Sequence, residues 1–241
     1  MFSGMFSSSS SSSSSNKKVP AKVRGAKLKA KGDVSGALEA LEEGLLTEPE
    51  ESVALHALIA QCHVLRQDWA RACRHFSSAL DEAGEEAITS PLFTKILDAE
   101  FYFAMGDACF RQQLHQQCVF AYDSALEFNA KPKATSLSAV HYQLGVTCRE
   151  LNELDRAVDH FQHVDKPLQV SLSQGDILCE MEACYAGMGD MENAEDCVRR
   201  ATQLGGTNAM PIRPENIAKV AWFRYQLDGK GVCFRGQFIS I

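Results

Sequence analysis

The sequence predicts an all-α protein built as an array of helical hairpins, and three observations support this fold class. Helix-like patterns alternate with short polar turns along most of the chain, and a strand pattern is evident only in the last dozen residues. A spacing of small and large apolar residues recurs at five places. Apolar residues make up 45% of the 241 positions, which is enough for a continuous core.

The recurring unit is a small residue, a larger apolar residue four positions later and usually another small residue three positions after that. Offsets of four and three place the three side chains on one face of a helix. The five triplets are Ala37, Leu41 and Gly44; Ala72, Phe76 and Ala79; Cys118, Tyr122 and Ala125; Ala157, Phe161 and Val164; and Ala194, Val198 and Ala201.

Another helix-like segment precedes each triplet. About a dozen residues before the first small residue, these segments carry Gly25, Ala60, Gly106, Gly145 and Glu182. A glycine inside a helix costs about 1 kcal/mol relative to alanine, so glycines at equivalent positions indicate a closely packed neighbour. We expect Gly145 and Ala157 to lie where the two helices of one hairpin touch, with Phe161 filling the space beside them.

Set against the pattern W-x2-L-G-x2-Y…A-x3-F…P, these five segments resemble the 34-residue tetratricopeptide repeat. The resemblance covers about residues 18–208 and implies a right-handed α-solenoid of about five degenerate helical hairpins. The repeats would begin near Lys18, Val53, Ala99, Ser138 and Gly175. These starts are 35, 46, 39 and 37 residues apart, so an insert precedes the third repeat. We expect Ser90-Pro91, in this insert, to open a long first helix.

Three further segments complete the predicted organisation. Residues 1–17 form a polyserine leader that buries nothing, so we expect it to be disordered. Residues 209–228 favour a capping helix beginning near Pro214, or alternatively the first half of a sixth repeat. Residues 229–241 form an irregular apolar tail, either a docking segment or the end of a shortened form of a longer array.

Charge and cysteine usage restrict the class of function. Residues 1–32 hold seven of the 24 basic side chains and no acid, which leaves 17 basic and 31 acidic residues elsewhere. That acidic body argues against nucleic-acid binding. The nine cysteines form no CxxC pair and favour a reducing compartment, the cytoplasm or nucleus. We expect no membrane span, because no apolar run approaches 18 residues.

The basic segment from Lys17 to Lys31 permits three interpretations. Its lysines form a solvated face of the first repeat helix, or a nuclear localisation or polyanion-binding patch. Alternatively, the acid-free residues 1–32 are an organelle transit peptide. Cleavage of such a peptide would remove the opening helix of the first repeat.

Catalytic motifs are not evident in this sequence. It contains no GxSxG, GxGxxG or GxxxxGK[ST] pattern. His160 and His163 could share a helix face and bind a metal ion, but no further ligand has a suitable spacing. We therefore interpret them as surface histidines and predict no enzyme activity, no cofactor and no metal site.

The resemblance implies that the first helices line a concave face. The family's groove positions are the second, fifth, ninth and twelfth of each repeat. Carried onto this chain, they give the partner-binding candidates Lys22, Lys29, Gln61, Phe103, Asp107, Phe110, Tyr142 and Arg149, with Glu100, Asp176 and Cys179 at further groove positions. The alternative is a register shifted by one residue, which would make the aromatic candidates core residues.

Chaperone-binding members of the family use a clamp of lysine, asparagine and arginine side chains for a terminal carboxylate. At the equivalent positions this chain has Lys22, Ala26, Leu58, Glu100 and Ala104. Only Lys22 matches, and Glu100 would repel a carboxylate. We therefore expect no binding of a chaperone tail through that clamp.

These observations predict a non-enzymatic scaffold or adaptor that binds a partner peptide or helix in the concave groove. An alternative is a structural subunit of a large assembly, because the stretch SPLFTKILDAEFYFAMGDACFRQQLHQQCVFAYDSAL resembles tetratricopeptide subunits of the anaphase-promoting complex, a ubiquitin ligase. A rival from another class is a protein that uses cysteine and histidine for metal or thiol chemistry.

Overall fold

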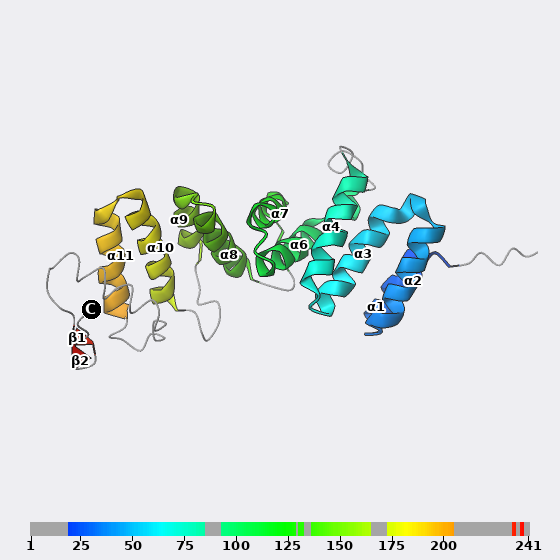
Figure 1. Cartoon of the computed structure of the whole chain (residues 1–241), viewed down its shortest axis with the longest axis horizontal. Helices are drawn as coiled ribbons and strands as arrows, with labels where there is room; N and C mark the ends of the chain where they lie inside the picture. Colours follow the sequence, from blue (N-terminus) through cyan, green and yellow to red (C-terminus); the bar gives the residue numbers. More distant parts are fainter. Residues whose placement is uncertain are drawn as a thin grey trace, which may run out of the picture.

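The chain folds into a row of helical hairpins, seen here in a computed structural model (Figure 1). The structure describes residues 19–84, 93–128, 130–132, 136–164, 173–204, 233–234 and 237–238. Within these residues, five hairpins stand side by side from the N-terminal pair to the C-terminal pair (Figure 1). The second helix of each hairpin packs on the first helix of the next. This arrangement is the predicted α-solenoid.

The first helices of the hairpins are α1 (Ala21–Ala30), α3 (Ser52–Leu65), α6 (Ala99–Arg111), α8 (Leu137–Glu150) and α10 (Gln174–Met188). The second helices are α2 (Val34–Thr47), α4 (Trp69–Ala83), α7 (His115–Glu127), α9 (Leu154–Gln162) and α11 (Met191–Leu204). Two 3-10 helices, η1 (Pro49–Glu51) and η2 (Phe93–Lys95), precede α3 and α6. Every first helix begins close to its predicted repeat start.

All five hairpin turns share one backbone geometry. A residue just past each first helix has a positive φ: Gly32 (85°), Gln67 (59°), Gln113 (56°), Asn152 (62°) and Gly189 (80°). The N–H of this residue and that of the next one donate to carbonyls three and five residues earlier. In the fourth turn, Asn152 N reaches Arg149 O at 2.9 Å and Glu153 N reaches Cys148 O at 2.8 Å. This pattern is the Schellman motif, which satisfies the last helical carbonyls while the chain reverses.

Aspartates begin the second helix in three of these turns. Asp33, Asp68 and Asp190 each accept a hydrogen bond from the backbone N–H three residues later, at 2.9, 3.2 and 3.2 Å. Such caps satisfy N–H groups that have no partner within the helix. The Gly-Asp pairs at residues 32–33 and 189–190 therefore end one helix and begin the next.

The start of the third repeat differs from the prediction. The first helix, α6, begins at Ala99, after Asp98, whose Oδ1 accepts a hydrogen bond from Phe101 N at 3.0 Å. The expectation that Ser90-Pro91 opens this helix was wrong, because the Asp98 cap sets its start. Ser90-Pro91 itself lies outside the described residues.

The small residues of the repeat let paired helices approach closely, as predicted. Every member of the five triplets is buried. A Cβ atom added to Gly145 would lie 2.6 Å from Cε1 of Phe161, and one added to Gly106 would lie 2.5 Å from the ring of Tyr122. Both distances are well below ordinary contact. The glycines therefore make room for the aromatic residue of the partner helix.

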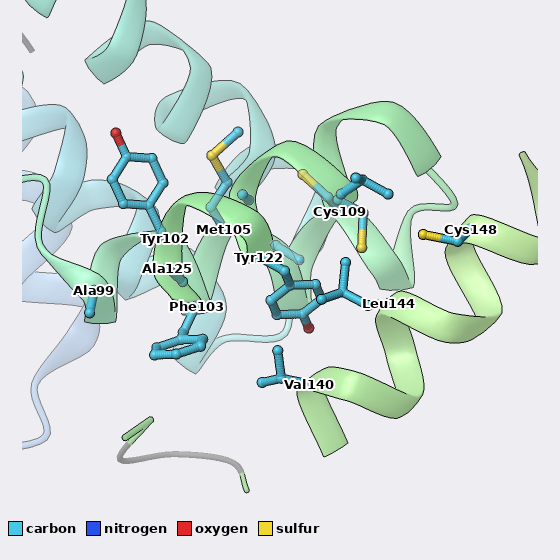
Figure 2. Packing of buried hydrophobic residues seen from close by; sticks show 14 of the residues in the cluster. Ala99, Tyr102, Phe103, Met105, Cys109, Tyr122, Ala125, Val140, Leu144 and Cys148 are labelled. Atoms are coloured by element: carbon cyan, nitrogen blue, oxygen red, sulfur yellow. The ribbon is translucent and has the colours of Figure 1, made fainter. Parts of the chain in front are cut away.

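The buried apolar side chains of the third and fourth hairpins belong to one continuous core cluster. Tyr122 of α7 lies beside Val140 and Leu144 of α8, and Cys109 and Cys148 contribute sulfur to the same cluster (Figure 2). The described cysteines from Cys62 to Cys197 are buried, and none of them forms a disulfide. They act as small apolar residues, which agrees with their predicted positions inside helices.

The predicted flanking segments lie mostly outside the described residues. This holds for the polyserine leader at 1–17 and for the capping helix at 209–228. Within 229–241, where we expected an irregular tail, β1 (Cys233–Phe234) pairs antiparallel with β2 (Gln237–Phe238). Across the described part of the chain, every helix is too short or too polar to cross a membrane.

Candidate protein-binding cleft

A cleft of about 610 Å³ lies on the first helices of the second and third hairpins. Helix α3 supplies half of the lining, α1 adds one lysine, and η2 and α6 with the residues between them supply the rest. The described residues that line it are Lys29, Ala54, Ala57, Leu58, Gln61, Val64, Leu65, Lys95, Ile96, Asp98, Glu100 and Ala104. Helices α1, α3 and α6 are first helices, which the resemblance to the tetratricopeptide repeat assigns to the concave face.

The lining combines apolar side chains with charges of both signs. Leu65 is 60% exposed, and Leu58 and Ile96 line the same cleft. Lys29 and Lys95 bring positive charge, whereas Asp98 and Glu100 bring negative charge. An exposed apolar group in a hollow with a polar edge is typical of an interaction site.

Lys29 is held in place by its neighbour on α3. Its Nζ donates to Oε1 of Gln61, which joins the first hairpin to the second across the cleft. Burial lowers the pKa of the Lys29 amine, and the nearby Cys62 thiol partly opposes this. Two of the predicted partner-binding residues, Lys29 and Gln61, are therefore brought together and line one cleft.

Three other polar candidates lie outside this lining and bind within the protein. Lys22 forms an ion pair with Glu51 at 2.6 Å. Asp107 accepts a hydrogen bond from the Tyr122 hydroxyl at 2.6 Å, and burial raises the pKa of its carboxyl group. Arg149 pairs with Glu180 of α10 and, at 2.8 Å, with Glu150. Apart from the Arg149–Glu150 pair within α8, these contacts connect different helical elements.

The aromatic candidates are part of the core or pack against it. Phe103 is only 3% exposed and belongs to the main apolar cluster. Phe110 and Tyr142 are partly buried and pack against that cluster, and the Tyr142 ring centroid lies 5.9 Å from that of Phe161. The core interpretation, which the sequence left open, therefore fits Phe103.

The two other groove positions of the fifth repeat are also buried. Asp176 has no exposed surface, and its carboxylate accepts from Ser173 N and Oγ at 2.8 and 2.9 Å in a capping box. Cys179 is 1% exposed. The predicted groove positions therefore do not form one continuous exposed strip through all five repeats.

Sequence reasoning missed the contribution of the insert before the third repeat. Lys95, Ile96 and Asp98 line the cleft from this insert, where no repeat position exists. The only signal in the sequence is the spacing of 46 residues between the second and third repeat starts. An insert longer than the neighbouring connections is a candidate for functional residues.

Comparisons with known proteins support the fold. No protein-family model and no curated protein matches the chain by sequence. The chain is similar in structure to YrrB, described as a TPR protein with an unusual peptide-binding site, with a TM-score of 0.56 and 15% identity over 79% of this chain and 87% of that one.

Two MamA structures are also similar to this chain. The AMB-1 form P212121 gives a TM-score of 0.53 and 18% identity over 77% of this chain and 90% of that one. Another MamA crystal structure gives 0.51 and 18% over 76% and 88%. At such identities the likeness shows the fold. The protein is thus an α-solenoid, and its architecture is that of the tetratricopeptide repeat. The resemblance to anaphase-promoting complex subunits stays a prediction.

Proposed function

We propose that this protein is a non-enzymatic scaffold or adaptor that binds a segment of a protein partner in the cleft between α3 and α6. The observation that carries the proposal is the apolar surface left open there. Leu65 is 60% exposed beside Leu58 and Ile96, in a hollow of about 610 Å³. Burial of such side chains by a partner releases about 25 cal/mol per Å² of apolar surface.

The lining favours a peptide or helix with an apolar anchor and charged neighbours. Lys29 and Lys95 complement an acidic side chain of the partner, and Asp98 and Glu100 complement a basic one. Charges of both signs give orientation more than affinity. The peptide-binding site named for YrrB supports this proposal by analogy of fold.

The proposal narrows the predicted binding set. Lys29 and Gln61 remain partner-binding candidates because they line the cleft. The others have internal roles, since they are buried in the core, pack against it or bind a neighbouring helix; they are Lys22, Phe103, Asp107, Phe110, Tyr142 and Arg149. We also propose a location in the cytoplasm or nucleus, because none of the cysteines from Cys62 to Cys197 forms a disulfide in the described part of the chain.

Paired charge substitutions test the proposal. Leu65→Glu places a carboxylate in the cleft, whereas Leu46→Glu makes the same change at a leucine of α2 that is 86% exposed and outside the lining. Partners captured by the wild-type protein are quantified for both variants, with helicity checked by circular dichroism. We expect Leu65→Glu to reduce capture at least tenfold and Leu46→Glu to leave it unchanged. Equal capture by both variants would exclude the cleft as the binding site.

A further inference from the structure

The second and third hairpins meet through a pair of sulfur atoms. Cys73 of α4 and Cys109 of α6 are 36 residues apart in the sequence, and their Sγ atoms lie 3.8 Å apart. Both side chains belong to the main apolar cluster, in which Figure 2 shows the Cys109 sulfur. Two side chains that can form a covalent bond with each other therefore lie in contact across the junction between two hairpins.

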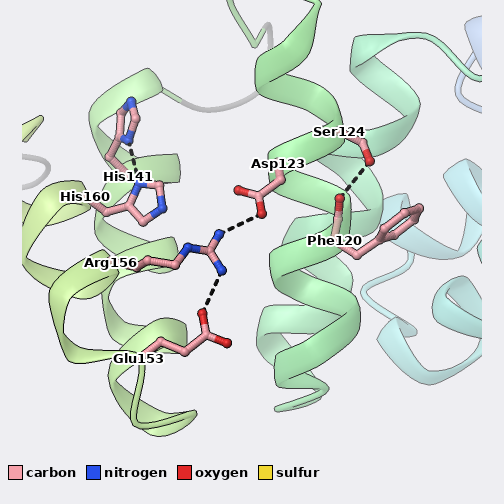
Figure 3. A network of polar contacts seen from close by, with 7 residues as sticks. All are labelled: Phe120, Asp123, Ser124, His141, Glu153, Arg156 and His160. Atoms are coloured by element: carbon pink, nitrogen blue, oxygen red, sulfur yellow. Dashed lines mark hydrogen bonds and ion pairs between the residues drawn. The ribbon is translucent and has the colours of Figure 1, made fainter.

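The junction between the third and fourth hairpins uses charge instead. Arg156 of α9 donates to Asp123 of α7 at 2.8 Å and to Glu153 at 2.6 Å (Figure 3). All three side chains are at least 41% exposed. Exposed ion pairs of this kind contribute little to stability and form and break without chemical change. The sulfur contact differs from this junction because it offers a covalent link between helices.

The geometry requires only a small movement to form that link. The sulfur atoms of a disulfide are about 2.0 Å apart, so the two Sγ atoms must approach by about 1.8 Å. Rotation about the Cα–Cβ bond of each cysteine moves its sulfur while the backbone stays in place. Helices α4 and α6 already pack against each other, so a slight shift of the two helices can complete the approach.

The cysteine pair lies one layer of side chains below the surface. The Sγ atom of Cys109 is 3.9 Å from Oε1 of Gln117, an exposed residue of α7. Cys73 is itself 5% exposed. Displacement of the flexible Gln117 side chain opens a path to the sulfur atoms for a molecule as small as hydrogen peroxide.

The contact between the two thiols also gives them different roles. A hydrogen bond from the Cys109 thiol lowers the pKa of the Cys73 thiol. The same contact, together with burial, raises the pKa of Cys109. Because the thiolate is the nucleophilic form of cysteine, Cys73 is the residue that reacts first with an oxidant and Cys109 is the residue that resolves the product.

We propose that Cys73 and Cys109 form a disulfide between α4 and α6 when the protein meets hydrogen peroxide. The Cys73 thiolate attacks one peroxide oxygen and breaks the O–O bond, which gives a sulfenic acid and a hydroxide that takes up the Cys73 proton. The Cys109 sulfur then attacks the sulfenic sulfur, and the S–O bond breaks as the hydroxyl group leaves with the Cys109 proton. Peroxide is thereby reduced to two water molecules while two thiols are oxidised to one disulfide.

The consequence is a reversible covalent link between the second and third hairpins. In a reducing compartment the thiol form is the resting state, and exchange with a small thiol restores it after oxidation. The disulfide closes a loop of about 36 residues, which contains the insert before the third repeat.

Peroxide treatment of the full-length reduced protein tests this proposal. The native protein is treated with hydrogen peroxide, its remaining thiols are alkylated, and its peptides are mapped by mass spectrometry. We expect a crosslink between the peptides that carry Cys73 and Cys109, with the loss of two hydrogen atoms. Dithiothreitol should restore both thiols, and circular dichroism should show the same helicity before and after oxidation.

Cys118→Ala is the matched control, because Cys118 is buried in the same cluster but its Sγ faces Oγ1 of Thr147 at 3.5 Å. This variant should form the crosslink at the wild-type rate. Cys73→Ala should form no crosslink and should lose thiols to peroxide at least tenfold more slowly. Should that variant lose helicity, Cys109→Ala removes the same bond from the other helix.

Three results would overturn the proposal. In the first, both cysteines of the wild-type protein remain free thiols after peroxide treatment. In the second, Cys73 is oxidised to a sulfinic acid without a bond to Cys109. In the third, the folded protein forms its main crosslink between other cysteines.

Discussion

Substitution of Gly145 by alanine probes the contact between the two helices of the fourth hairpin. The added Cβ would lie 2.6, 2.7 and 2.9 Å from three ring atoms of Phe161, which is 1% exposed. Ordinary carbon–carbon contact is about 3.5–4.0 Å, so the ring must shift by roughly 1 Å. Overpacking of this kind costs about 1–3 kcal/mol. Alanine is also a better helix former than glycine by about 1 kcal/mol. The expected net decrease in the free energy of unfolding is therefore about 1 kcal/mol.

Gly187 provides a matched control on the first helix of the fifth hairpin. It is exposed, and an added Cβ would meet only the tip of the Leu154 side chain, Cδ1, at 2.8 Å. That flexible end can move aside. Gly187→Ala should therefore stabilise the folded protein by up to about 1 kcal/mol, because alanine is the better helix former. The two substitutions are chemically identical, yet their effects on stability should have opposite signs.

Urea denaturation, followed by circular dichroism, measures both changes in the free energy of unfolding. Phe161→Leu should relieve the clash, so that Gly145→Ala costs less in that background than in the wild type. Gly145→Leu should cost about 3 kcal/mol or more, because its side chain has no space beside the ring. An increase in stability for Gly145→Ala equal to that for Gly187→Ala would refute the close crossing.

Three further predictions concern single positions in the third hairpin. Gln113→Gly should stabilise by about 1 kcal/mol, because Gln113 has φ of 56° and glycine adopts that conformation without strain; thermal denaturation checks this. Leu114→Asp should add about 1 kcal/mol by supplying the N-cap that α7 lacks, which urea denaturation measures. Asp107→Asn should stabilise the folded protein at pH 7 and should have no stabilising effect below pH 3.8. Burial raises the folded-state pKa of this carboxyl group above 3.8, so the stability linked to its neutral form is lost as pH rises through the folded-state pKa; urea denaturation at both pH values measures the change.

Local sequence patterns were sufficient to predict the solenoid. Triplets such as Ala157, Phe161 and Val164 set the buried face, and a costly helix glycine at Gly145 indicated a close neighbour. The turn geometry could not be predicted as well from the sequence, because Gln67 and Gln113 adopt the same left-handed conformation as Gly32. Glutamine carries no signal for that conformation, and the tertiary packing of the hairpin imposes it.

The lining of the proposed binding cleft was predicted only in part, because exposure depends on contacts that one repeat does not encode. Lys29 and Gln61 line the cleft as the family register implied, but Phe103 at the same kind of position is buried in the core. Lys22 is paired with Glu51 of η1, which lies just before the second repeat. Lys95 comes from an insert that has no counterpart in the other repeats, so no register could place it.

Site-specific photo-crosslinking tests the central claim most directly. A photoreactive amino acid placed at Leu65 lies in the cleft, and the same residue placed at Leu46 lies on α2 outside the lining. We predict that the partner segment is crosslinked from position 65 and not from position 46, with the adduct identified by mass spectrometry. Adducts formed equally at both positions, or only at position 46, would contradict binding in the cleft between α3 and α6.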